Sequence, residues 1–479
     1  MPIENRGLKT IPAHMLVKPV ARPYDQVMSS SLGLSVGAVI QVQTERLAYQ
    51  GGAVARHEGL AIFIPLAAPG ESLRVRIVEI KKNFARAEIE EILVPSAVRR
   101  EPVCQYFGDC GGCQLQHITY AAQLSAKASF VSDSLARVGR ISWTRPIEVR
   151  SADEFGYRSR AQVKVERLNG ESPLGKPVQE GESGERYSES GVEQGQATQS
   201  RELASGLVAH GLRIGFNRAG SHSVCDVVSC PILTPKLNLA LGAVRSALEA
   251  TSGAWLQEGS DIQDEFELAA GDHGVSSAPA VAGMTSRRVE QTVGGMKYLF
   301  GPRTFFQSNP LLLEDLVNAV TEEESGHLAV DLYAGVGLFS ARLAKQFGRV
   351  LAVESDPEAV VFGRKNMTRN GLSNVEYLSQ RADAWTRRYL AGSSSARRPI
   401  PDLIVLDPPR AGASALVDDL IKMRAPRITY VSCDPVTLSR DLSRLTPSYR
   451  IKEIVAFDLF PQTYHVETIA KLEIDKDRN

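Results

Sequence analysis

The chain has 479 residues, of which 43% are hydrophobic, and its 55 Lys and Arg side chains are balanced by 55 Asp and Glu side chains. This composition is ordinary for globular domains, and the length allows two to four of them. Zero net charge means that a nucleic-acid role must rest on local basic patches. No apolar run approaches the roughly 20 residues of a membrane span, and no signal-peptide pattern opens the chain. We expect a cytoplasmic monomer without membrane contacts.

The first third of the chain has the pattern of a small β-barrel. From about residue 36 to residue 93, short runs that alternate apolar and polar residues are separated by turn signals such as Gly51-Gly52. Basic residues gather in the second half of this segment: Arg74, Arg76, Lys81, Lys82 and Arg86. These side chains form a candidate surface for phosphates, although charge alone favours a solvated strand face.

Two stretches of the barrel segment carry a family resemblance. Gly51-Gly-Ala-Val-Ala-Arg-His-Glu-Gly and Pro69-Gly-Glu-Ser resemble the TRAM domain, a small RNA-binding barrel attached to RNA-modifying enzymes. The resemblance implies an OB-like barrel over residues 30–96 and favours RNA contacts for its basic face.

Three cysteines follow the barrel in a C-x5-C-x2-C pattern: Cys104, Cys110 and Cys113. Gly111 and Gly112 let the backbone wrap tightly there, so the pattern predicts a metal site. A fourth ligand must come from elsewhere, and the candidates are Cys225 and Cys230, or, for zinc, His117 and His222. Spacing alone does not separate an iron–sulfur cluster from zinc.

The middle of the chain is less informative. Apolar spacing predicts a helix over residues 120–138, and a strand should follow residue 157. That strand carries interleaved Tyr157, Arg158, Arg160 and Lys164, which fit either an RNA contact with base stacking or an exposed strand edge. Residues 169–202 have almost no large apolar side chains and predict a flexible insertion. The Gly, Ala and Ser residues near 269–283 predict a loop.

The C-terminal part alternates strands and helices, which predicts a mostly parallel, doubly wound sheet. Asn309 followed by Pro310 should start its first helix. The glycines of Asp331-Leu-Tyr-Ala-Gly-Val-Gly allow a sharp turn under a ligand, and Glu354 ends the next strand where an acid can accept ribose hydroxyls. Asp383 is placed for an adenine amino group. This pattern favours an S-adenosylmethionine site over a nucleotide-linked oxidoreductase.

Two further strand ends carry an acid and a thiol, Asp407 and Cys433. Carbon-5 of a pyrimidine is a poor nucleophile, but a thiolate that adds to carbon-6 makes carbon-5 reactive toward a methyl donor. A base must then remove the carbon-5 proton, and His465 and Glu467 are the candidates, alternating on one expected strand. A buried structural thiol is the alternative for Cys433. Its position directly after a strand favours the nucleophile.

Several motifs together resemble the RNA (uracil-5-)-methyltransferase family. They are Phe305-Phe-Gln-Ser-Asn, Asp331-Leu-Tyr-Ala-Gly-Val-Gly, Asp407-Pro-Pro-Arg-Ala-Gly, Ser432-Cys-Asp-Pro and His465-Val-Glu-Thr. The cysteine segment is similar to the family's [4Fe–4S] signature, in which the fourth cysteine precedes a proline, as Cys230 does here. The resemblance therefore implies an α/β protein with an N-terminal barrel (30–96), a central α+β iron–sulfur and RNA-binding region (97–295), and a C-terminal Rossmann-like methyltransferase domain (296–479).

The resemblance also implies roles for single residues. Cys433 is the expected nucleophile and Glu467 the proton-abstracting base. The expected cluster ligands are Cys104, Cys110, Cys113 and Cys230. The methyl donor, S-adenosylmethionine, is expected beside Gln307, Tyr333, Glu354 and Asp407, with Asp383 added from the strand pattern. Two residues depart from the family: Leu338 replaces an Asn found in some members, and Gln462 replaces a common His.

The resemblance to family members that carry both the barrel and the cysteine signature implies large-subunit (23S) ribosomal RNA as the substrate, with transfer RNA as the alternative. An RNA cytosine-5-methyltransferase uses the same thiol chemistry, but its Asp-containing motif carries a second cysteine that Asp407-Pro-Pro-Arg lacks. A non-catalytic iron–sulfur RNA-binding protein is the other alternative, and the presence of both thiol and base argues against it.

Overall fold

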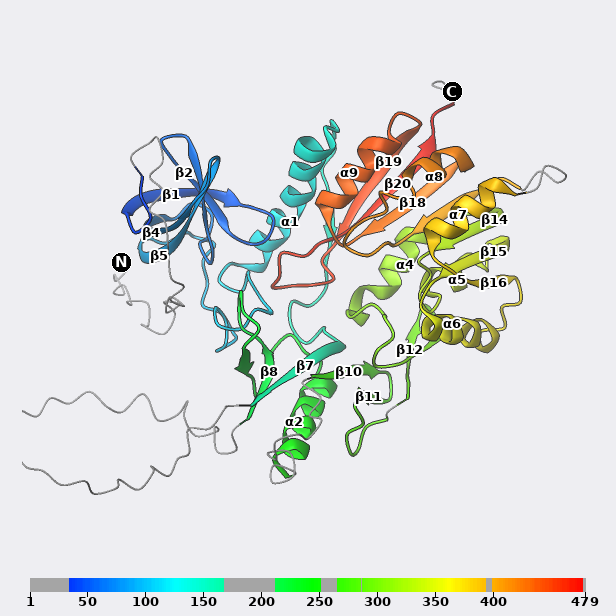
Figure 1. The fold of residues 1–479 in the computed structure, drawn as a ribbon, viewed down its shortest axis with the longest axis horizontal. Helices are drawn as coiled ribbons and strands as arrows, with labels where there is room; N and C mark the ends of the chain where they lie inside the picture. Colours follow the sequence, from blue (N-terminus) through cyan, green and yellow to red (C-terminus); the bar gives the residue numbers. More distant parts are fainter. Residues whose placement is uncertain (1–33, 168–211, 251–264, 286, 393–398, 477–479) are drawn as a thin grey trace, which may run out of the picture.

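The computed structural model describes residues 34–167, 212–250, 265–285, 287–392 and 399–476. Figure 1 shows three parts: a barrel in blue, a central sheet in green, and a larger C-terminal sheet in yellow to red. The insertion expected at 169–202 lies outside the described residues. Within the described residues, no helix is both long enough and apolar enough to cross a membrane.

The N-terminal part is a closed five-stranded barrel, as the sequence predicts. Its strands are β1 (Val39–Leu47), β2 (Ala53–His57), β3 (Leu60–Ile64), β4 (Ser72–Ile80) and β5 (Phe84–Val94). Alternation along β4 buries Leu73, Val75 and Ile77 completely and turns the arginines between them outward.

Acidic side chains form ion pairs with most of the basic residues on the expected basic face of the barrel. Arg74 pairs with Glu91, Arg76 with Glu90, and both Lys81 and Arg86 with Glu79. These pairs offset most of the positive charge that the sequence places on this face, so the strip is weaker as a phosphate surface than its basic residues suggest.

The central part combines a long helix with a five-stranded sheet. The helix α1 (Tyr120–Ser134) continues as the π-helical turn η2 (Leu135–Gly139), which confirms the expected helix. The sheet has the order β11-β10-β7-β8-β9. Its strands are β7 (Arg160–Arg167), β8 (Leu212–Asn217), β9 (Val224–Asp226), β10 (Glu265–Gly271) and β11 (Gly274–Ala278), and α2 (Pro235–Ala250) packs on it.

The loop predicted at residues 269–283 is wrong for its first half, where β10 ends and β11 forms. The small side chains that suggested a loop are buried at a close contact instead: Ser276 and Ser277 are fully buried, and a Cβ on Gly271 would lie 2.3 Å from the Glu290 carbonyl oxygen. The neighbouring hairpin pairs β12 (Val289–Val293) with β13 (Met296–Phe300). The expected domain boundary at residue 295 falls in its turn.

The C-terminal part is an eight-stranded sheet with the order β16-β15-β14-β17-β18-β20-β19-β6. Its strands are β14 (Gly326–Leu332), β15 (Phe347–Glu354), β16 (Val375–Ser379), β17 (Leu403–Leu406), β18 (Arg427–Ser432), β19 (Tyr449–Phe457) and β20 (Glu467–Ile474), with β6 (Glu148–Arg150) added at one edge. Strands β14 to β18 are parallel, and β20 runs antiparallel to both its neighbours.

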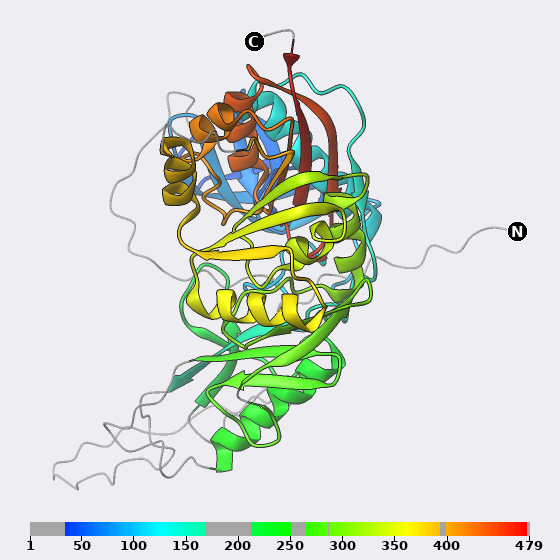
Figure 2. The same ribbon diagram turned by 90° about the vertical axis from the view of Figure 1, so that its right-hand side faces the viewer.

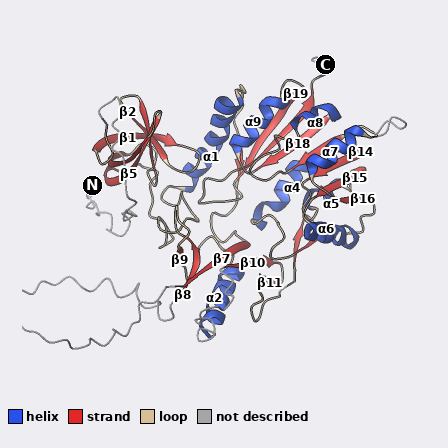
Figure 3. Ribbon diagram, viewed as in Figure 1, coloured by secondary structure: helices blue, strands red, loops and turns tan. Residues whose placement is uncertain are grey.

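Helices cover both faces of this sheet, as Figure 3 shows. One face packs against α4 (Leu313–Thr321), α5 (Leu338–Leu343) and α6 (Pro357–Arg369). The other packs against α7 (Ala382–Ala391), α8 (Val417–Met423), α9 (Pro435–Leu445) and part of α1. Asn309 accepts a hydrogen bond from Leu311 N and caps the 3-10 turn η3 (Pro310–Leu312) before α4, as predicted. The strand order reverses between β14 and β17, which is where ligands bind in such sheets.

Side chains from the central part of the chain hold the loop between β19 and β20 in place. Lys127 Nζ on α1 donates to Asp458 Oδ1 at 2.5 Å, and both side chains are completely buried. Tyr157 donates from its hydroxyl to the Pro461 carbonyl at 2.9 Å. These contacts join the central part to the loop that leads into β20. Figure 2 shows the green strands of the central sheet below the yellow strands of the C-terminal sheet.

Lys127→Ala should lower the free energy of unfolding by about 3–5 kcal/mol, because it leaves the Asp458 carboxylate buried without its cation. Urea unfolding followed by tryptophan fluorescence measures the loss. Arg349→Ala is a suitable control, since the Arg349–Glu376 pair is 60% and 48% exposed and should contribute less than about 1 kcal/mol. Equal losses in the two variants would contradict the assignment of Lys127 as a buried anchor.

Candidate active site

Three reactive side chains meet at neighbouring strand ends. Asp407 directly follows β17, and Cys433 directly follows the adjacent parallel strand β18. Glu467 opens β20, which pairs with β18 so that Ser432 lies opposite Thr468. The next position along this ladder places Glu467 beside Cys433. The acid and thiol expected at adjacent strand ends are therefore adjacent, and the second acid joins them from a third strand.

The three groups influence one another electrostatically. Burial raises the pKa of Cys433 to about 12, with Glu467 and Asp407 adding to the rise and Arg410 opposing it. Burial and then Asp407 raise the pKa of Glu467 well above its usual range. Glu467 is only 2% exposed, and its Oε1 has no hydrogen-bond partner among the described residues. An unpaired buried carboxyl oxygen is costly for stability, which is typical of a site kept for chemistry.

Asp407 also faces the first strand of the sheet. Desolvation raises its pKa, and the nearby Asp331 carboxyl raises it further. Gln307, which is 6% exposed, donates weakly to Asp407 Oδ2 at 3.5 Å. Asp331 in turn accepts a hydrogen bond from the Ser340 hydroxyl at 2.5 Å. Gln307 and Asp407, both expected near the donor, therefore lie together, and Asp331 is a further acid that the sequence did not single out.

The turn after β14 has the shape that the glycine pattern predicts. Tyr333 and Gly335 have φ angles of 63° and 53°, in the left-handed region. A Cβ on Gly335 would meet no atom within 4 Å, so the turn faces open space. Glu354 Oε2 accepts a hydrogen bond from Gly335 N at 2.9 Å. The turn and the acid at the end of β15 thus form one wall, which fits a nucleoside.

Asp383 and Leu338 lie near the glycine turn, but neither is placed as the sequence suggests. Asp383 lies in the first turn of α7. Burial is the largest cause of the raised pKa of Tyr333, and the nearby Asp383 carboxylate is the next. This carboxylate is already paired with Arg381 at 2.9 Å and Arg387 at 2.5 Å, which hold its pKa low. Leu338 is 7% exposed and packs in the apolar core, so the departure from a polar Asn removes no group from the open space.

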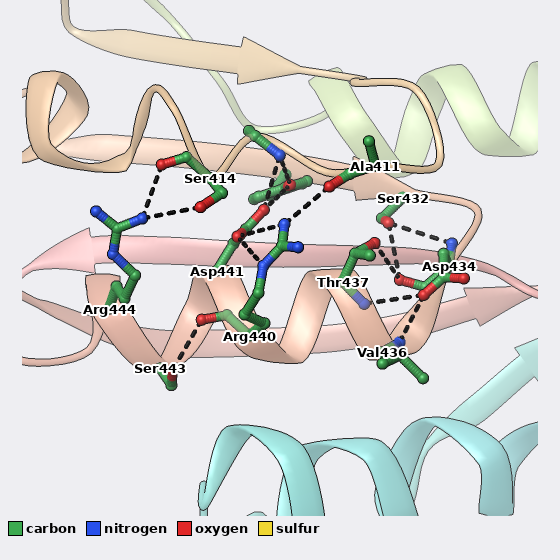
Figure 4. A network of polar contacts seen from close by, with 12 residues as sticks. Ala411, Ser414, Ser432, Asp434, Val436, Thr437, Arg440, Asp441, Ser443 and Arg444 are labelled. Atoms are coloured by element: carbon green, nitrogen blue, oxygen red, sulfur yellow. Dashed lines mark hydrogen bonds and ion pairs between the residues drawn. The ribbon is translucent and has the colours of Figure 1, made fainter.

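A polar network on α9 fixes the loops that carry Asp407 and Cys433 (Figure 4). Asp434, next to Cys433, caps α9 by accepting from Val436 N and Thr437 N, each at 2.9 Å. Arg440 donates to the Ala411 carbonyl at 2.8 Å, and Asp441 Oδ2 accepts from Ala413 N at 2.7 Å. One helix therefore sets the distance between the loop after β17 and the loop after β18.

His465 is positioned differently from the sequence expectation. It lies in the loop before β20, so it does not share a strand face with Glu467. Its Nε2 is 3.1 Å from Arg410 Nη2, and burial and this arginine lower its pKa to about 4. His465 is therefore neutral near pH 7. Of the two candidate bases, Glu467 is the one that acts on the pKa of the Cys433 thiol.

The strand expected after residue 157 is present as β7, but two of the four side chains expected to contact RNA, Tyr157 and Arg160, are engaged within the protein. Tyr157 is fully buried and cannot stack a base. Arg160 donates to the carbonyls of Gly301 and Pro302, so it holds the loop before Gln307. Strand β7 lies between β10 and β8 and is not an exposed edge.

The cysteine loop is tied to the hairpin of β8 and β9. Gly111 N donates to the Asn217 carbonyl at 2.9 Å, and Ala219 N donates to the Asp109 carbonyl at 2.8 Å. The Tyr106 hydroxyl accepts from Val228 N at 3.1 Å, two residues before Cys230. The loop with three cysteines and the segment that carries Cys230 are thus neighbours, although about 120 residues separate them.

The thiols themselves are near one another, but their sulfur atoms do not converge on a common metal position. Burial raises the pKa of Cys110 to about 11, and the thiols of Cys230 and Cys104 add to the rise. Cys113 is influenced by the same neighbours. Even so, no three or more His, Cys, Asp or Glu side chains of the described residues converge into a metal site. Cys225 donates to Asp109 Oδ2 at 3.4 Å, as an ordinary buried thiol does.

The doubly wound sheet, its glycine turn and its strand-end acids define an S-adenosylmethionine-dependent methyltransferase. A family model described as tRNA (Uracil-5-)-methyltransferase matches residues 288–474, and a TRAM domain model matches residues 34–89. The chain belongs to the RNA (uracil-5-)-methyltransferase family and is an enzyme that acts on RNA.

Relatives establish this family assignment over more than nine tenths of the chain. The 23S rRNA (uracil(1939)-C(5))-methyltransferase RlmD of Klebsiella pneumoniae subsp. pneumoniae is 30% identical over 484 residues, covering 94% of this chain and 99% of the relative. An uncharacterized RNA methyltransferase of Thermosynechococcus vestitus is 30% identical over 488 residues, covering 91% and 98%. The structure of a Pyrococcus abyssi tRNA (uracil-54, C5)-methyltransferase with S-adenosyl-L-homocysteine has a TM-score of 0.62, 23% identity, and coverage of 90% and 100%. That last likeness concerns the fold alone.

Proposed function

We propose that the enzyme methylates carbon-5 of one uridine in 23S ribosomal RNA, and that Cys433 forms a covalent bond to the base. The observation that carries the proposal is the placement of Cys433, Glu467 and Asp407 at three neighbouring strand ends. The printed activity of the Klebsiella relative supports ribosomal RNA as the substrate. Such a substrate also fits the cytoplasmic location expected from the sequence. The target base must leave its stack to reach these side chains.

The chemistry follows from the order in which the side chains act. The Cys433 thiolate adds to carbon-6 of uracil, and the electrons of the carbon-5 to carbon-6 double bond move toward the carbon-4 oxygen. Carbon-5 then takes a methyl group. Glu467 removes the carbon-5 proton, the double bond re-forms, and the bond from sulfur to carbon-6 breaks, which releases Cys433. S-adenosylmethionine, when bound, supplies the methyl group on a positively charged sulfur.

The proposed donor site is the open space beside the glycine turn. Gln307, Tyr333, Glu354 and Asp407 are proposed to line it. Tyr333 follows β14, Asp407 follows β17 and accepts from Gln307, and Glu354 ends β15 and accepts from the glycine turn. Asp383 is proposed at its edge, where a ligand must compete with Arg381 and Arg387 for the carboxylate. The acidic surroundings of Asp407 suit a cationic sulfonium, because an opposite charge relieves the repulsion between Asp331, Asp407 and Glu467.

We also propose that Cys104, Cys110, Cys113 and Cys230 hold a [4Fe–4S] cluster. The hydrogen bonds that join their two backbone segments support this, as does the influence of each thiol on its neighbours. The thiols do not form a metal site as they stand among the described residues. Binding therefore requires the four side chains to turn toward a common centre.

Anaerobically purified enzyme should contain about four iron and four sulfide per chain, and Cys230→Ser should lose most of the iron. Cys225→Ser is the matched control, because Cys225 donates to Asp109 and lies outside the proposed ligand set. Metal analysis and the visible absorption spectrum measure both. Stoichiometric zinc, or iron that survives Cys230→Ser and is lost with Cys225→Ser, would overturn the ligand assignment.

Loss of one 5-methyluridine from 23S ribosomal RNA is the expected result when the gene is deleted. Mass spectrometry of nuclease fragments from ribosomal and transfer RNA identifies the position, and a plasmid copy should restore it. Loss of a transfer-RNA 5-methyluridine with an unchanged ribosomal map would make transfer RNA the substrate. Loss of a 5-methylcytidine would replace the uridine assignment.

A further inference from the structure

The barrel reaches the loop that carries Cys433. Tyr49 lies just beyond the end of β1, and its hydroxyl donates to Asp434 Oδ2 at 3.1 Å across 385 positions of sequence. Asp434 is the residue after Cys433 and caps α9 with its other oxygen, Oδ1. A single carboxylate thus joins the barrel, the helix and the thiol loop.

The Tyr49 ring is held on several sides. Its edge contacts with the Tyr464 and Phe130 rings have centroid distances of 5.5 Å and 5.9 Å. A Cβ added to Gly51 in the same loop would lie 3.0 Å from Gln114 Cβ and 3.6 Å from Tyr464, so the loop packs tightly. The ring itself makes these packing contacts, and the hydroxyl makes the hydrogen bond to Asp434. The ring places the donor, and the donor acts on the loop of Cys433.

We propose that Tyr49 is a positioning residue of the reaction: through Asp434 it holds the Cys433 loop in place and shares the negative charge beside the thiol. The barrel is then a part of the catalytic centre as well as a module attached to it. This inference rests on the proposed function, in which Cys433 attacks the base.

Charge gives the proposal a specific signature. The groups that interact electrostatically with the Cys433 thiol are Glu467, Asp407, Arg410, Asp434 and Tyr49. Burial raises the pKa of Cys433 most, Glu467 and Asp407 raise it further, and Asp434 makes a smaller contribution in the same direction. A hydrogen bond from Tyr49 draws charge away from that carboxylate. Removing the donor should therefore move the pKa of the thiol up, and neutralising Asp434 should move it down.

The test measures how fast the full-length enzyme forms a covalent adduct with substrate RNA that contains 5-fluorouridine, at saturating RNA and S-adenosylmethionine. Tyr49→Phe keeps the ring contacts and should slow adduct formation about tenfold, the effect of losing a hydrogen bond to a charged group. RNA affinity should change less than about twofold, because the hydroxyl is directed at Asp434. The pH midpoint of adduct formation should rise in Tyr49→Phe and fall in Asp434→Asn, which still caps α9.

Two comparisons keep the test decisive. Arg46→Ala removes another contact of the barrel, the 2.7 Å ion pair with Asp133 on α1, and should leave the adduct rate unchanged. In Asp434→Asn, adding Tyr49→Phe should have little further effect, because both act through one carboxylate. An unchanged rate in Tyr49→Phe, an equal loss in Arg46→Ala, or multiplying effects of the two variants would overturn the inference. Failure of the wild type to form an adduct would instead overturn the proposed function.

Discussion

Cys433→Ala is expected to form no detectable 5-methyluridine, a loss of at least about a thousandfold, because carbon-5 of uracil gains its reactivity only from the thiolate at carbon-6. The same variant should form no covalent complex with 5-fluorouridine RNA. In the wild type the fluorine blocks the final proton removal, so the complex persists. Denaturing gels that separate free RNA from protein-bound RNA measure the difference.

Cys225→Ala is the matched control for this variant. Cys225 is also a buried thiol, but it lies in the central sheet, where it donates to Asp109. It should form the covalent complex at the wild-type rate. Equal trapping by the wild type and Cys433→Ala would show that Cys433 is not the nucleophile.

Glu467→Gln should stop the reaction one step later. The glutamine keeps the shape of the buried side chain but cannot take the carbon-5 proton, so turnover should fall about 10²–10⁴-fold. Methylated RNA should then remain bound to Cys433, even with ordinary uridine in the substrate. A covalent complex on a denaturing gel, with a methyl label from the donor, is the readout.

The charge of Glu467 also predicts a pH dependence. Burial and Asp407 raise the pKa of Glu467, so the carboxylate that acts as base is lost as the pH falls through this raised value. Wild-type turnover should therefore increase as the pH rises through this raised pKa. Glu473→Gln on the same strand is the control, since Glu473 is 43% exposed at the side chain and its loss should leave turnover unchanged. Free release of methylated RNA by Glu467→Gln would assign the proton transfer to another group.

Local sequence patterns predicted the parts of the fold that depend on neighbouring residues. Alternation in β4, the Asn309 cap and the strand–helix alternation after residue 326 all appear in the structure. The strand-end positions of Asp407 and Cys433 followed from the same reasoning, because a parallel sheet gathers such ends at one edge. Small side chains misled it at β10 and β11, where they serve close packing.

Contacts between distant segments were beyond a local pattern. The local sequence around Tyr157 and Lys127 does not indicate that both side chains make buried contacts with the loop between β19 and β20. The same holds for Tyr49 and Asp434. Gln462 is instructive, because the sequence marked it only as a departure from the family. Its backbone φ is 68°, and its buried side chain bonds both Gln123 at 2.9 Å and Glu154 at 2.8 Å, so it joins α1 and the central region to this loop.

The most direct test of the account is to locate the covalent bond. Wild-type enzyme is incubated with S-adenosylmethionine and 5-fluorouridine RNA, the complex is digested with nuclease and protease, and the peptide is sequenced by mass spectrometry. We predict a nucleotide on Cys433 whose mass includes one added methyl group. A nucleotide on any other residue, or an adduct on Cys433 without the methyl group, would contradict it.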